Sequence, residues 1–216
     1  MIITRLELRN FRSYPSLSLD FSEKDNVLIG KNGAGKTNLV EGIYLLSLCK
    51  SWRSNDIRTL IRQGEEAAFI RAYVREGEMS RKIEILITPK GKKISLNDKP
   101  VKRLSELSKL VNVTLFSPED VNLFKDSPSS RRSFLDVSIS KESVPYLSLI
   151  GRYGKILQER NVALKSPNPD KTYLEVLTNQ LIDVSEPITR YRREYLTRLN
   201  EILNEVANAL YENNRS

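Results

Sequence analysis

Apolar and polar residues alternate along much of the first half of the chain, a pattern that predicts β-strands with one buried face. In the clearest run, Ser16 to Phe21, the residues Leu17, Leu19 and Phe21 share one side. Ser13-Tyr14-Pro15 precedes this run and favours a turn, so it should pair antiparallel with the strand before it. The predicted strands cover residues 3–11, 16–21, 26–29, 67–75, 81–87, 94–96 and 111–116.

After Thr37 the apolar residues recur every three or four positions, which predicts a helix through about Leu48. A short helix is expected from Asp56, and the spacing is again helical from Ser117 onward. The longest predicted helices cover residues 143–163 and 172–213. At about 1.5 Å per residue the last would be roughly 60 Å long. Pro187 should kink this helix or divide it in two.

Two domains are predicted, an α/β lobe over residues 1–126 with a mixed β-sheet and a helical subdomain over residues 127–216. Ser127-Pro128 is typical of a helix start, with a capping hydroxyl followed by proline at the first helical position. Two arrangements of the helices remain open: a compact bundle or a projecting antiparallel arm.

The chain carries 35 Lys and Arg against 27 Asp and Glu, a net charge of +8 that lies mostly before residue 127. A basic balance favours polyanionic partners such as nucleic acid, although a solvated basic surface gives the same count. The single cysteine excludes an intrachain disulfide, and the absence of histidine excludes histidine catalysis and histidine metal ligands. No stretch approaches the roughly 18 apolar residues of a membrane span, and the single cysteine suits a reducing compartment, so a cytoplasmic protein is expected.

The strongest chemical signal lies between the strand predicted at 26–29 and the helix predicted after it. The phosphate-loop pattern is matched at every fixed position by Gly30-Lys31-Asn32-Gly33-Ala34-Gly35-Lys36-Thr37. Its glycines allow the backbone to approach a phosphate, and successive N–H groups form an anion nest at a helix start. Lys36 would bind the β- and γ-phosphates, and the hydroxyl of Thr37 would bind Mg²⁺. The sequence therefore predicts a site for ATP and Mg²⁺.

Two further segments resemble known families. Asn10-Phe11-Arg12, together with the loop and Asn38, is similar to the ATPase heads of SMC-like and ABC-type proteins. The segment 118–136 resembles the signature of the RecF family of bacterial recombination mediators, with Asp126 and Phe124 departing from it. The matching residues are Pro118, Glu119, Pro128, Arg131, Arg132, Phe134, Leu135 and Asp136. Residues 11–14, 41–44 and 158–164 also match.

The resemblance implies an SMC-like α/β head followed by a helical arm, with Arg12 and Asn38 at the nucleotide. It also implies an ATP-dependent homodimer that binds DNA at junctions or gaps during repair, replication and the SOS response. Such a protein helps to load recombinase on single-stranded DNA, with a mediator partner such as RecR. Expected DNA contacts are Arg53, Arg58, Arg62, Lys92, Lys93, Lys102 and Arg103.

Two motifs that the resemblance implies, the ABC signature and the Walker B carboxylates, were not found. The chain is therefore expected to be the N-terminal portion of a longer protein, able to bind nucleotide but not to hydrolyse it alone. The longer protein would be a weak, DNA-dependent ATPase. Two alternatives stay open: a subunit of another ABC-type machine, which a missing glutamine in residues 116–119 disfavours, and a non-hydrolysing DNA-binding scaffold.

The arginines of the second resembling segment lie near a predicted helix start, where positive charge opposes the helix dipole. Either a phosphate or acidic partner explains Arg131 and Arg132, or a local ion pair with Asp136 does.

Overall fold

The computed structural model describes residues 1–102, 107, 110–123, 125 and 127–213. The chain separates into two compact units, Met1–Phe116 and Ser117–Ser216, so the predicted boundary at residue 126 lies inside the second unit. We describe each unit by itself.

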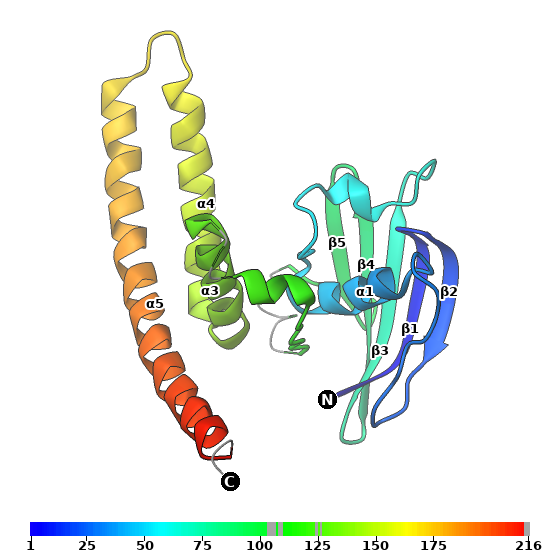
Figure 1. Ribbon diagram of the computed structural model, residues 1–216. Coiled ribbons are helices and arrows are strands. Elements are labelled where there is room, and N and C mark those ends of the chain that lie inside the picture. Colours follow the sequence, from blue (N-terminus) through cyan, green and yellow to red (C-terminus); the bar gives the residue numbers. More distant parts are fainter. Residues whose placement is uncertain (103–106, 108–109, 124, 126, 214–216) are drawn as a thin grey trace. The chain divides into compact units, whose positions relative to one another are not determined.

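A six-stranded sheet forms the frame of the first unit (Figure 1). The strand order is β2-β1-β3-β4-β5-β6, and all the pairings between these strands are antiparallel. The strands are β1 (Ile2–Phe11), β2 (Tyr14–Asp20), β3 (Ala68–Glu76), β4 (Met79–Thr88), β5 (Gly91–Leu96) and β6 (Lys99–Pro100). The predicted hairpin at residues 76–79 is confirmed, with Gly77 at a φ of 59° in its turn.

Helix α1 (Lys36–Leu48) covers one face of this sheet (Figure 1). Leu45 and Leu46 of α1 are fully buried in one core with Leu6 and Leu8 of β1. The helix packs closely, because a Cβ added to Gly42 would lie 3.0 Å from a methyl group of Leu8. The sheet therefore fixes where the N-terminus of α1 lies, and with it the phosphate loop.

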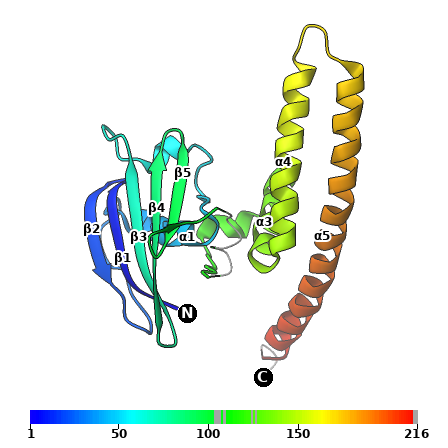
Figure 2. The ribbon, with the colours of Figure 1, turned by 180° about the vertical axis from the view of Figure 1, so that it is seen from behind.

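The opposite face of the sheet, seen in Figure 2, carries paired charges. Arg71 of β3 donates to Glu7 of β1 at 2.9 Å and to Glu84 of β4 at 2.7 Å. These side chains lie on neighbouring strands, where opposite charges stabilise the pairing modestly. The charge of Arg71 is therefore matched by two acidic neighbours on this face.

Two predicted strands are wrong: residues 26–29 and 111–116 belong to no strand. A segment becomes a strand only when a neighbouring backbone accepts and donates its hydrogen bonds, and no described segment does this for either one. Some of their apolar side chains are left in solvent, with exposed fractions of 79% for Val27, 92% for Ile29 and 82% for Phe116. Others, such as Leu28 and Val111, pack in the core of the first unit without joining a strand. The apolar character of these segments shows that they could pair as strands, but none of the described residues pairs with them.

The second unit is built from helices (Figure 1). These are the 3₁₀-helix η2 (Pro118–Asn122) and the α-helices α3 (Pro128–Glu142), α4 (Val144–Leu164) and α5 (Lys171–Asn213). The predicted start of α3 is confirmed, since the Ser127 side chain accepts from the Ser130 N–H and Pro128 follows it. In the views of Figures 1 and 2, α4 and α5 run side by side in opposite directions.

Pro187 does not divide α5, which is one helix of 43 residues. Proline in a helix interior removes one hydrogen bond and strains the preceding turn. Packing on both sides of it compensates, because Val184 and Ile188 are buried in the core of the helical unit. The prediction that Pro187 divides the helix is therefore wrong, because tertiary packing holds the helix together on both sides of the proline.

Asp136 joins three helices in this unit. Its carboxylate accepts from both Nε and Nη2 of Arg192 on α5, at 3.0 and 2.8 Å, and from the Tyr146 hydroxyl on α4 at 2.5 Å. Burial raises the pKa of Tyr146, and the hydrogen bond to Asp136 raises it further. The sequence offered Asp136 as a possible partner for Arg131 and Arg132. In the structure its carboxylate pairs with Arg192 of α5.

Candidate nucleotide-binding site

The phosphate loop follows residues 21–29, which belong to no strand, and leads into α1. Residues 30–34 are exposed, and Gly33 and Gly35 have positive φ angles of 83° and 94°. A side chain at either position would be strained. The Ala34 N–H donates to the Lys31 carbonyl at 3.2 Å, which closes the turn.

Gly35 also has a steric role. A Cβ at this position would lie 2.8 Å from the hydroxyl of Tyr14 and 3.2 Å from that of Ser13. Both residues belong to the junction of β1 and β2. The loop therefore rests directly on that junction, so that residues distant in sequence define its shape.

The ammonium group of Lys36 donates to the carbonyl oxygens of Gly30 and Lys31, at 2.6 and 2.9 Å. The Lys36 side chain thus reaches from the first residue of α1 back across the loop to its first two residues. The predicted role requires this placement, because an ammonium that bridges the loop is held where phosphate oxygens would contact it.

The N-terminus of α1 has the character of an anion site. Its N-cap is Gly35, which offers no side chain to the first N–H groups, and its first turn contains no acidic residue. No residue of α1 itself therefore offsets the positive end of the helix dipole at this N-terminus. Thr37 is exposed in this turn.

Thr37 could supply one ligand to Mg²⁺, which prefers oxygen. Across the described residues, no group of three or more Asp, Glu, Cys or His side chains could hold a metal ion.

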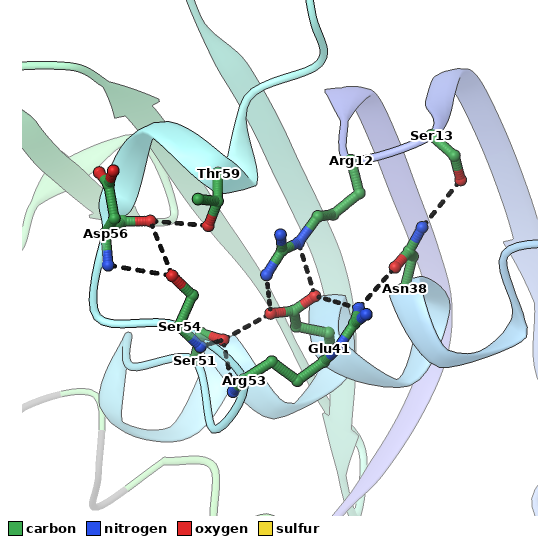
Figure 3. Close-up of polar contacts among 9 residues, drawn as sticks. All are labelled: Arg12, Ser13, Asn38, Glu41, Ser51, Arg53, Ser54, Asp56 and Thr59. Atoms are coloured by element: carbon green, nitrogen blue, oxygen red, sulfur yellow. Dashed lines mark hydrogen bonds and ion pairs between the residues drawn. The ribbon is translucent and has the colours of Figure 1, made fainter.

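Arg12 is held beside α1 by a buried acid (Figure 3). Its Nε and Nη2 donate to the two carboxylate oxygens of Glu41, at 2.8 and 2.7 Å. Such two-point pairing fixes the plane of a guanidinium as well as its position. Arg12 itself has a positive φ of 53°, an uncommon conformation for a residue with a side chain. The main chain there is held by the bond from the Arg12 N–H to the Leu60 carbonyl, 3.0 Å.

The side chain of Asn38, the residue after the loop, is hydrogen-bonded to two other segments of the chain. Its Nδ2 donates to the Ser13 hydroxyl at 2.9 Å, and its Oδ1 accepts from Arg53 Nη1 at 2.8 Å (Figure 3). Arg53, expected to contact DNA, therefore lies at the start of α1. The sequence pattern did not reveal this contact, because the partners are 15 residues apart in a loop without periodicity.

The remaining basic residues expected at DNA lie on different segments of the first unit. Arg58 and Arg62 lie on or just after the 3₁₀-helix η1 (Ile57–Leu60), and Arg62 pairs with Glu65 at 3.7 Å. Lys92, Lys93 and Lys102 line a hollow of about 770 Å³ together with Lys50, which the sequence reasoning missed. Arg103 lies outside the described residues.

Lys92 has a structural partner in that hollow. Its ammonium donates to the Cys49 carbonyl at the C-terminal end of α1, where a cation is favourable. Burial lowers the pKa of Lys92 and raises that of the Cys49 thiol to about 12. Arg53 contacts Asn38 and Lys92 contacts Cys49, 11 residues further along α1, so the two contacts lie about 16 Å apart along the helix axis.

A glycine-rich phosphate loop that opens a helix packed on an antiparallel sheet defines the nucleotide-binding heads of the SMC-like class. Residues 2–183 match the family described as RecF/RecN/SMC N terminal domain, and the chain belongs to that family. The predicted fold class and family resemblance are therefore confirmed. Within the described residues, no helix is long and apolar enough to cross a membrane.

Individual RecF proteins are similar to this chain. The DNA replication and repair protein RecF of an Exiguobacterium species is 43% identical over 211 residues, 95% of this chain and 56% of that protein. RecF of Bacillus cereus is 40% identical over 205 residues, 93% of this chain and 55% of that protein. A solved structure of the recombination mediator protein RecF with ATP, in the RecFOR pathway, has a TM-score of 0.83 at 32% identity, covering 91% of this chain and 54% of that one. The chain thus spans about half the length of these relatives.

Proposed function

We propose that this chain is the nucleotide-binding part of a RecF-type DNA repair and replication protein. The observation that carries the proposal is the phosphate loop, with Lys36 bridging its first carbonyl oxygens and an uncompensated helix N-terminus behind it. Similarity to a RecF structure with ATP supports ATP as the nucleotide. Mg²⁺ would bind Thr37 and the phosphates.

The proposal extends to the full-length protein. It would act in the cytoplasm as an ATP-dependent homodimer on DNA, hydrolyse ATP slowly, and help to load recombinase with a mediator partner such as RecR. The net charge of +8 and the exposed basic residues of the first unit support a polyanionic partner.

Among the proposed DNA contacts, Arg53, Arg58, Lys93 and Lys102 are exposed, and Arg53 is held by Asn38 and Glu41. Phosphate contacts give binding that ignores sequence and weakens steeply with salt. We expect the double variant Lys93→Ala, Lys102→Ala of the full-length protein to bind duplex more weakly. Its slope of log K against log salt should be shallower by about 2, since each neutralised phosphate contributes about −0.9.

The measurement is a salt titration of duplex binding, with and without ATP. Removing two exposed charges from α4, by Arg152→Ala and Lys155→Ala, is the matched control and should leave the slope unchanged. An equal change in both variants would mean that net charge alone is responsible. No change in the lysine variant would place the DNA contacts elsewhere.

A further inference from the structure

Among the described residues, Glu41 is the only charged residue that is buried, and its side chain is fully inaccessible. It lies one helical turn after Thr37 on α1, on the side that faces the loop of residues 50–56 (Figure 3). Besides the two bonds from Arg12, its carboxylate accepts from the Ser51 hydroxyl at 2.5 Å and from Arg53 Nη1 at 3.3 Å. One carboxylate thus gathers two arginines from two different segments.

Stability alone does not explain this arrangement. Removing a carboxylate from water costs several kcal/mol, and a buried ion pair is often no more stable than apolar residues of the same volume. Two guanidinium groups around one carboxylate also leave a net positive charge of one. A site that retains an excess charge at this cost is suited to an anion.

The two arginines retain hydrogen-bond donors. Arg12 uses Nε and Nη2 for Glu41, and Arg53 uses Nη1 for Glu41 and Asn38. For Nη1 of Arg12, and for Nε and Nη2 of Arg53, no partner occurs among the described residues. Guanidinium donors of this kind bind phosphate oxygens well.

The network ends at the phosphate loop. Arg53 donates to Asn38, which directly follows Thr37, and Asn38 donates to Ser13, against which Gly35 packs. In the phosphate-loop pattern, Lys36 and Thr37 serve the β- and γ-phosphate end of the nucleotide. Both guanidinium groups are therefore tied to the turn of α1 that would lie beside the terminal phosphate.

We propose that Glu41 is a positioning residue, which holds Arg12 and Arg53 together at the start of α1 so that they distinguish a nucleoside triphosphate from a diphosphate. This inference rests on the proposed nucleotide function and specifies it. Glu41 touches no phosphate itself. Its carboxylate fixes the guanidinium planes, and the remaining donors with their excess charge favour the ligand with the additional phosphate.

The test is the ratio of the ADP and ATP dissociation constants, measured by competition against a fluorescent ATP analogue. The parent chain should prefer ATP. Glu41→Gln keeps the shape but removes the charge that orients both arginines, and should reduce this preference about tenfold, the size of one charged hydrogen bond. Arg53→Gln, at a side chain that is 40% exposed, should do the same with little risk to folding.

The double variant, Glu41→Gln with Arg53→Gln, should lose no more than the larger single loss, because both changes remove the same contact. Glu84→Gln is the matched control: it breaks an arginine pair on the opposite face of the sheet and should leave the ratio unchanged. Thermal unfolding of each variant without nucleotide reports stability separately.

A merely structural Glu41 would weaken ATP and ADP equally, and an unchanged ratio in Glu41→Gln and Arg53→Gln would overturn the inference. So would a parent that binds ATP and ADP equally well, although the proposed nucleotide function would stand. A parent that binds neither nucleotide would overturn both.

Discussion

Lys36→Ala is expected to weaken ATP binding by about 10- to 150-fold, the range that corresponds to one charged hydrogen bond. The variant removes the ammonium that bridges Gly30 and Lys31 across the loop. No other group replaces it there, because the remaining loop donors are backbone N–H groups. Titration of a fluorescent ATP analogue measures the effect directly.

Lys31→Ala is the matched control for this loss. It removes the same charge from the same loop, but at an exposed position that the phosphate-loop pattern does not specify. We expect a change of no more than a few-fold. If Lys36→Ala bound ATP within a factor of about two of the parent, or if Lys31→Ala lost as much, the assignment of the phosphate-binding lysine would be wrong.

Asp136→Ala should lower the free energy of unfolding of the helical unit by about 2 kcal/mol. The carboxylate accepts from Arg192 and from Tyr146, and Tyr146 is fully buried. Its removal leaves both donors without their acceptor and loosens the junction of α3, α4 and α5. A partly exposed Arg192 can recruit water, so we expect less than the full cost of a buried unpaired charge.

Two signals separate the units in a denaturant titration. Far-ultraviolet circular dichroism follows mainly the helices, while the single tryptophan, Trp52, lies in the first unit. Asp136→Ala should shift the first signal and leave the second. Glu142→Ala, which breaks an exposed pair with Arg198, is the control and should cost well under 1 kcal/mol. Equal costs for both variants would contradict the role given to Asp136.

Local patterns predicted the elements that are stabilised locally. Strict alternation identified β2, β3 and β4, and the serine-proline pair identified the start of α3. The glycines and lysine of the phosphate loop predicted its place before α1. In each case, the signal depends on neighbouring residues whose conformations the sequence restricts directly.

Features that depend on distant partners could not be predicted in this way. Residues 26–29 form a short apolar run typical of a strand, but strand formation requires a second backbone that the described residues do not supply. Asp136 pairs with Arg192, which lies 56 residues away in the sequence. From the sequence, Glu41 is an ordinary polar residue of a predicted helix. Only the fold shows that it is buried between Arg12 and Arg53. Periodicity does not contain such information.

The central claim, that the loop from Gly30 to Thr37 binds the nucleotide phosphates, can be tested most directly through its own backbone N–H groups. Proton–nitrogen correlation spectra would be recorded while ATP, and separately adenosine, is added to the isotope-labelled chain. The account predicts that ATP, but not adenosine, shifts the amide signals of Gly33, Gly35, Lys36 and Thr37 most strongly. Largest shifts around Lys92 and Lys93, with the loop signals unmoved, would contradict it.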